Sequence, residues 1–299
     1  MRMRIALLLL LSLALPVVAQ DLLDDEAASP AATLPSSVHA LRDIHYGADA
    51  LQTLDVYRGD NPHNAPVIVM VHGGGWRIGD KSMGRMVESK VARWVPRGFV
   101  FVSVDYGLLP RTPVSRQVDD VAHALAFVQQ HAPEWGGAAD AVILMGHSAG
   151  AHLVDVLAAA PQRAFAAGAR PWLGTISLDS AALDVARVMR GRHLPLYDAA
   201  FGSDASTWKA LSPIELVKAP APPLLLVCST LRPDDSCGQS HRFAERAAAM
   251  GVRTEVREEK LTHGQINFTL GAPGAYTDAV ERFMNSLNPH MRDLLQVTP

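Results

Sequence analysis

The sequence predicts an α/β fold, a mostly parallel β-sheet with helices packed on both faces. Short runs of apolar and β-branched residues alternate with longer segments of helical character along nearly the whole chain. The runs in the middle of the chain are apolar throughout, which is typical of strands buried on both faces. With 299 residues, of which 48% are hydrophobic and 19% charged, the chain can bury a sizeable core. We therefore expect one domain over residues 38–299.

The alternating pattern predicts where each strand and helix lies in the chain. Strands are expected over Thr53–Tyr57, Pro66–Val71, Val100–Val104, Ala141–Met145, Thr175–Leu178, Pro223–Cys228 and Thr254–Glu258. Helices are expected between them, over Ser82–Val95, Arg116–His131, Ala149–Ala159, His241–Ala249 and Ala275–Leu287. From Leu183 to Val217 the periodicity weakens and glycine and proline recur. Long excursions of this kind are usually functional, so we interpret residues 183–217 as a small cap over the active site.

The N-terminal segment predicts export. Arg2 and Arg4 precede an apolar run from Ile5 to Ala14, and Val17 and Ala19 suit a cut after residue 19. The apolar stretch is shorter than the roughly 20 residues that span a bilayer, which favours a cleaved signal peptide over a retained membrane anchor. Residues 20–37 lack apolar periodicity and are expected to form a flexible lead-in. The leader is compatible with a periplasmic or a secreted protein.

The charge and the cysteine content of the chain indicate which partners and which compartment to expect. The formal net charge is -3, and no basic cluster suggests binding to nucleic acid. The two cysteines, Cys228 and Cys237, would meet an oxidising compartment after export and could form a disulfide, with two free thiols as the alternative. The sequence does not indicate an oligomeric state.

Two glycine-containing motifs follow predicted strands. Gly146-His147-Ser148-Ala149-Gly150 lies between a buried strand and an alanine-rich helix, the context of the sharp turn that exposes a nucleophilic serine. The small residues at positions 146 and 150 would let strand and helix pass closely. His72-Gly73-Gly74-Gly75-Trp76 follows an earlier strand, where glycine N–H groups can stabilise an oxyanion. We expect Gly74, Gly75 and the N–H of Ala149 to form this oxyanion hole around Ser148.

These motifs resemble those of the hormone-sensitive-lipase-like and arylformamidase-like esterases of the α/β-hydrolase superfamily. The resemblance rests on His72–Trp76, on Gly146–Leu153 and on Tyr106–Pro110, where Gly107 replaces the arginine usual in that family. It extends from about Leu41 to Leu287. It implies an eight-stranded sheet, a catalytic triad in the order Ser, Asp, His, and neither a metal nor an organic cofactor.

Triad order then predicts the remaining catalytic residues. His263 follows the last predicted strand and precedes the final helix, so it is expected to be the general base. The acid is expected after the strand Pro223–Cys228, where Asp234 and Asp235 are adjacent. We favour Asp235, because it adjoins Ser236-Cys237, whereas Asp234 directly follows Pro233 and resembles a solvated turn residue. A bridge from Cys237 to Cys228 would hold whichever carboxylate orients the imidazole. The catalytic prediction is therefore Ser148, Asp235 and His263.

Two side chains next to these motifs are candidates for binding substrate. Trp76 and His147 flank the oxyanion and nucleophile motifs, although Trp76 could equally be a packing residue. The predicted function is hydrolysis of small to medium carboxylic esters through an acyl-enzyme. An arylformamidase-like amide hydrolase would use the same motifs, and a non-catalytic binding protein with this fold is a third alternative.

Overall fold

The computed structural model describes residues 32–295, so the predicted signal peptide and residues 20–31 of the lead-in lie outside the described residues. It contains an eight-stranded sheet in the order β1-β2-β4-β3-β5-β6-β7-β8. The strands β1 and β2 are antiparallel to their neighbours, and the pairs from β3 and β4 through to β8 are parallel. The strands are β1 His39–His45, β2 Thr53–Arg58, β3 Ala65–Val71, β4 Val100–Val104, β5 Gly137–His147, β6 Gly174–Leu178, β7 Leu224–Ser229 and β8 Thr254–Glu259.

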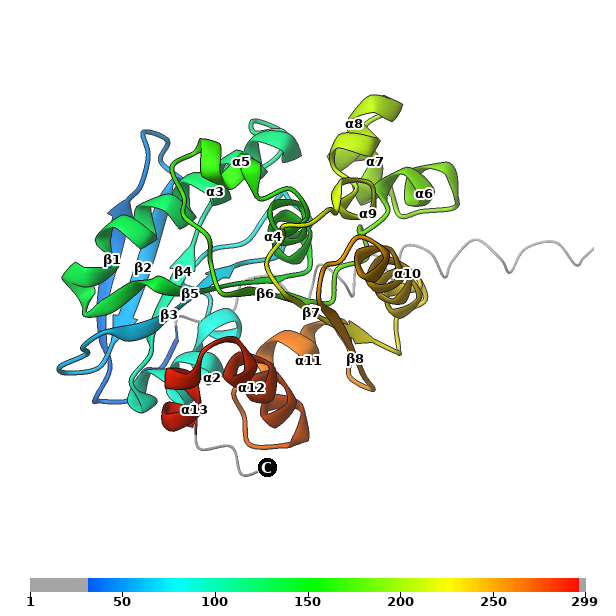
Figure 1. Ribbon diagram of the computed structural model, residues 1–299. Helices are drawn as coiled ribbons and strands as arrows, with labels where there is room; N and C mark the ends of the chain where they lie inside the picture. Colours follow the sequence, from blue (N-terminus) through cyan, green and yellow to red (C-terminus); the bar gives the residue numbers. More distant parts are fainter. Residues whose placement is uncertain (1–31, 296–299) are drawn as a thin grey trace, which may run out of the picture.

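Helices cover both faces of the sheet (Figure 1). One face packs against α3 Val114–His131, α4 Ala149–Ala159 and α10 Ser236–Ala249, and the other against α2 Gly84–Trp94, α11 His263–Phe268, α12 Ala275–Leu287 and α13 Pro289–Leu295. The central strand β3 shows how the sequence produces these layers. Val67, Val69 and Val71 enter one core, while Ile68 and Met70 enter the other, because successive side chains of a strand point to opposite faces.

The segment predicted to be a cap consists of short helices between β6 and β7. They are α6 Val185–Arg190, α7 Pro195–Phe201, α8 Ala205–Ala210 and α9 Pro213–Leu216, and they gather beside α4 and α10 (Figure 1). Further short elements are α5 Gln162–Ala166 and the 3-10 turns η1 Val95–Arg97 and η2 Ala132–Trp135. Within residues 32–295 no helix combines the length and apolarity that crossing a bilayer requires.

The predicted α/β architecture is confirmed, and each predicted strand and helix is present with its ends shifted by at most five residues, the largest shift being the start of α10. The strand β1 was not predicted. Its seven residues are exposed or half-buried, so the run carries no apolar pattern. It is an edge strand that depends on pairing with β2.

Candidate active site

Ser148 occupies a strained turn between β5 and α4. Its backbone has φ 55° and ψ -117°, a left-handed conformation that L-residues rarely adopt. A Cβ at Gly146 would collide with the Gly150 carbonyl, and a Cβ at Gly150 would collide with the carbonyls of Val71 and His72. The close passage of strand and helix therefore requires glycine at both positions, as the sequence predicts. The Ser148 N–H donates to the Leu178 carbonyl at 2.9 Å, which ties the turn to the end of β6.

The glycine loop after β3 lies against this turn. Gly75 has φ 58° and lines the same cavity as Ser148 and Ala149, as an oxyanion hole would require. Gly74 has φ 103° but does not line that cavity, and its carbonyl accepts from the N–H groups of the two residues that close the loop, at 3.0 Å each. The Tyr106 hydroxyl donates to the His72 carbonyl at 2.9 Å, which anchors the start of the loop.

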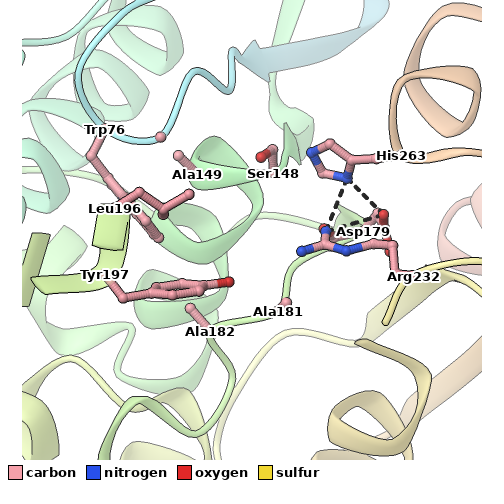
Figure 2. A pocket seen from close by; sticks show the side chains of 11 residues that line it. Trp76, Ser148, Ala149, Asp179, Ala181, Ala182, Leu196, Tyr197, Arg232 and His263 are labelled. Atoms are coloured by element: carbon pink, nitrogen blue, oxygen red, sulfur yellow. Dashed lines mark hydrogen bonds and ion pairs between the residues drawn. The ribbon is translucent and has the colours of Figure 1, made fainter. Parts of the chain in front are cut away.

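The acid beside His263 is Asp179, so the prediction of Asp235 is wrong. His263 Nδ1 lies 2.7 Å from Asp179 Oδ2, and both side chains are buried. Because a carboxylate can only accept, Nδ1 carries the proton and Nε2 is left as the acceptor. In Figure 2 this second ring nitrogen lies on the side of the ring that is turned toward Ser148. Asp179 directly follows β6, the strand next to the one that ends at the nucleophile.

Asp235 lies outside this arrangement for a local reason. It precedes α10 with φ 59°, its side chain is 64% exposed, and its carboxylate pairs with Arg242 at 3.1 Å. The other candidate, Asp234, is held by the guanidinium of Arg232. Neither carboxylate of this loop is therefore the partner of the imidazole.

Several donors fix the carboxylate of Asp179. Oδ1 accepts from the Ser229 N–H at 2.8 Å and from the Ser236 hydroxyl at 2.9 Å. Burial alone would raise the pKa of this carboxyl, but the charge of Arg232 and the hydrogen bond from His263 outweigh it and lower the pKa. Asp179 is therefore ionised and positioned to orient the imidazole.

A buried arginine completes the cluster. Arg232 comes from the loop after β7, where the acid was expected, and only 7% of its side chain is exposed. Its Nη1 donates to the Asp179 carbonyl at 2.8 Å and to Oδ2 at 3.2 Å, and it lies 2.9 Å from His263 Nδ1 (Figure 2). Since Nδ1 already donates to Asp179, this last contact acts through charge. Arg232 also binds both carboxylate oxygens of Asp234, at 2.8 and 2.5 Å.

The environment of His263 keeps the ring neutral. Burial lowers the pKa of the imidazole, the charges of Arg232 and His147 lower it further, and Asp179 opposes them. A neutral imidazole is the form that can accept a proton from a serine hydroxyl. The resulting arrangement can activate Ser148 as a nucleophile.

A disulfide joins Cys228 and Cys237, as predicted. It connects the end of β7 to the first turn of α10 and closes the loop between them. The loop carries Arg232 to the imidazole, so the bridge holds the arginine rather than the expected acid.

The catalytic cavity, as we call the space beside Ser148, has a volume of about 30 Å³. Its lining residues are Gly75, Trp76, Ser148, Ala149, Asp179, Ala181, Ala182, Leu196, Tyr197, Arg232 and His263. Trp76 lies in its wall, with its indole N–H donating to His152 Nδ1 at 3.3 Å. His147 does not line this space. It packs behind the base, its ring centroid 4.5 Å from that of His263, so its predicted contact with substrate is wrong.

Sequence reasoning missed Asp179 and Arg232 for identifiable reasons. Asp179 had a usable signal, because it is the first residue after a predicted buried strand and parallel strands end at the same edge of a sheet. Arg232 had none, since an arginine in a polar loop is usually solvated. Leu196 and Tyr197 lie in the segment predicted to be a cap, whose helices are too short for periodicity to reveal them. Within residues 32–295, no three His, Cys, Asp or Glu side chains are grouped to hold a metal ion.

Three features together define an α/β-hydrolase with the active site of a serine hydrolase: the order of the strands, the turn at Ser148 and the His263–Asp179 pair. Solved structures share this fold. Esterase B from Lactobacillus Rhamnosis has a TM-score of 0.71 and 19% identity, with 95% of each chain covered. Esterase 2 from Thermogutta terrifontis has a TM-score of 0.65 and 22% identity, covering 85% of this chain and 93% of that one.

Within this class the chain belongs to the BD-FAE family, whose model matches residues 54–246. Carboxylesterase NlhH of Mycobacterium tuberculosis is 32% identical, over 71% of this chain and 70% of that protein. Esterase LipQ of the same organism is 28% identical over 77% of this chain. The match spans 58% of the length of LipQ. The probable isoprenylcysteine alpha-carbonyl methylesterase ICMEL1 of Arabidopsis thaliana is 35% identical over 39% of this chain, and that match spans 24% of its own length. The predicted resemblance to α/β-hydrolase esterases is confirmed.

Proposed function

We propose that this chain is a serine carboxylesterase that hydrolyses small to medium carboxylic esters through an acyl-enzyme. The observation that carries the proposal is the His263–Asp179 contact of 2.7 Å beside Ser148 in one cavity. His263 Nε2 takes the proton of Ser148 as the hydroxyl oxygen attacks the ester carbonyl, and the N–H groups of Gly75 and Ala149 stabilise the oxyanion. The protonated His263 then donates to the leaving alcohol. A water activated by the same imidazole releases the acid.

Size and relatives support this substrate class. The catalytic cavity of about 30 Å³ has room for about two waters, which suits a small group next to the nucleophile. The relatives NlhH and LipQ are named as a carboxylesterase and an esterase. Asp179 orients the base in this mechanism, and Trp76 forms part of the cavity wall.

Export is part of the same proposal. The pattern of residues 1–19 supports a cleaved signal peptide, and the Cys228–Cys237 disulfide suits an oxidising compartment such as the periplasm or the exterior. Expression with the native leader, followed by fractionation and N-terminal sequencing, tests it. Mature chain beginning at Gln20 in the exported fraction is expected, and full-length chain in the cytoplasm would contradict it.

Covalent labelling tests the nucleophile. A fluorophosphonate probe should label the wild-type chain, and S148A should lose both the label and at least about 10⁴-fold of kcat on nitrophenyl acetate. Because alanine is smaller than serine, S148A should fold normally, and a thermal unfolding midpoint equal to that of the wild type is the control. A wild-type chain that neither takes the label nor hydrolyses short esters would instead favour the binding-protein alternative. Faster hydrolysis of an aryl formamide than of any ester would favour the amide hydrolase.

A further inference from the structure

A second cavity adjoins the catalytic cavity. It has a volume of about 540 Å³ and shares two wall residues, Ala181 and Tyr197, with the space beside Ser148. Its other walls come from α6 and the segment that follows it, from the loop between β7 and α10, and from the first turns of α10. We call it the arginine-lined cavity, and its remaining lining residues are Arg187, Val188, Gly191, Arg192, His193, Leu194, Pro233, Asp234, Asp235, Gln239 and Arg242.

The charges in its wall do not cancel. The two carboxylates are already neutralised, Asp234 by Arg232 and Asp235 by Arg242. Arg187 and Arg192, which also line this cavity, have no ion pair with any residue of the described part of the chain, residues 32–295. The wall therefore includes two exposed arginines without a counter-charge.

Unpaired arginines favour an anionic ligand, and the rest of the cavity wall indicates the chemistry of that ligand. Val188, Leu194, Tyr197 and Pro233 provide an apolar wall, and the volume lies within the range of about 300–1,000 Å³ typical of small-molecule sites. Guanidinium groups match the planar geometry of carboxylates, to which they donate two parallel hydrogen bonds. The matching ligand is an organic carboxylate with an apolar body.

We propose that the arginine-lined cavity is a subsite for a carboxylate carried by the ester substrate, several bonds from the ester group that Ser148 attacks. This inference rests on the proposed esterase function. The space beside Ser148 accommodates only a few atoms, and the arginine-lined cavity is the neighbouring space that shares Ala181 and Tyr197 with it, so the proposal places the rest of the substrate there. Arg187 and Arg192 then make the enzyme prefer anionic over neutral esters.

Two matched substrate pairs test the subsite. The first pair places the charge on the acyl side, as the mono-nitrophenyl ester of adipic acid and its methyl ester. The second places it on the leaving group, as the acetate ester of hydroxyphenylacetic acid and that of its methyl ester. In one of the pairs, the kcat/KM of the carboxylate should exceed that of the methyl ester about fivefold to tenfold. The pair that responds identifies which side of the ester occupies the subsite.

Charge variants connect that preference to the two arginines. In R187Q/R192Q the carboxylate-to-methyl-ester ratio should fall to about one. R190Q is the matched control, because Arg190 lies on the same helix but does not line the cavity, and it should keep the wild-type ratio. The wild-type preference should also weaken as salt is raised to about 0.5 M, since partly exposed charges are screened.

The outcomes separate this inference from the proposed function. Equal kcat/KM for both members of both pairs, or a preference that persists in R187Q/R192Q, would overturn the subsite while leaving an active esterase. If the wild-type chain hydrolyses none of the four esters and is not labelled by fluorophosphonate, the proposed function itself fails.

Discussion

At the scale of single residues, the position of the acid is the main departure from the sequence-based prediction. Asp179 directly follows a strand and Asp235 directly precedes a helix, and the position of Asp179 after a predicted buried strand makes it a candidate without deciding which of the two reaches His263. The difference lies in their surroundings. Asp179 is buried and accepts from Ser229, Ser236 and the imidazole, whereas Asp235 is exposed and paired with Arg242. Removing each carboxylate in turn therefore distinguishes them.

D179N should lower kcat on nitrophenyl acetate by about 10³- to 10⁴-fold, because an amide cannot hold the imidazole in the required tautomer. D235N is the matched control and should stay within about twofold of wild type, since it loses only an exposed ion pair. Steady-state kinetics of both variants, with thermal unfolding to verify folding, decide the question. A large loss in D235N with an active D179N would restore the original assignment.

The position of Arg232 next to His263 leads us to expect an effect on the pH dependence of activity. His263 must be neutral to accept a proton, so activity is present above the pKa of His263 and is lost below it. Burial, Arg232 and His147 all lower this pKa, with Asp179 opposing, and Asp234 compensates part of the arginine charge. R232Q removes one of the groups that lower the pKa, so the acid limb of the kcat/KM profile should move to higher pH.

R232K keeps a positive charge and should leave the acid limb closer to that of wild type. D234N, which keeps Arg232 but removes its compensating carboxylate, should not move the limb to higher pH. If R232Q lowers kcat without moving the acid limb, Arg232 serves only to hold the loop, and its electrostatic role is refuted.

At the scale of elements, the loop between β7 and α10 depends on the disulfide. Cys228 is buried at the end of β7, and the bridge restrains the unfolded chain as well as the native loop. For a bridge between positions nine residues apart, the loss on removal is about 2–3 kcal/mol of unfolding free energy. The same bridge restrains Arg232, so its loss should also affect catalysis.

Denaturant unfolding of the wild-type chain with and without reductant measures this contribution. C228A/C237A should unfold at a lower denaturant concentration than the oxidised wild type and should not respond to reductant. Equal midpoints for the oxidised and reduced wild type would show that the bridge adds no stability.

The short elements explain which parts of the fold escaped prediction. Helices α6 to α9 have four to seven residues each, too few for an apolar period to be recognised. They are held by tertiary packing, for example of Tyr197 and Phe201 against Trp76, with ring centroids 5.9 and 5.0 Å apart. Only the loss of periodicity over residues 183–217 indicated that something other than a regular helix lies there.

At the scale of the whole molecule, the alternation of strands and helices was predictable because burial dictates composition. Strands such as β3 are covered on both faces and must be apolar throughout, which is visible in sequence. The turn at Ser148 was predictable too, since the close passage of strand and helix requires glycine at 146 and 150. The partner of His263 was not, because it depends on which of several loops at one edge of the sheet extends toward the ring.

The location of Asp179 has a consequence for how this molecule can change. Ser148 and Asp179 follow β5 and β6, which hydrogen-bond to each other, and His147 pairs with Leu178 in that ladder. The backbone spacing between nucleophile and acid is thus inherited from neighbouring strands, and the segment of residues 230–235 contributes to it through Arg232, which donates to the Asp179 carbonyl and carboxylate. The rest of that segment can therefore change in sequence, by evolution or by an engineer, to select new substrates, provided that Arg232 and its contacts to Asp179 are kept.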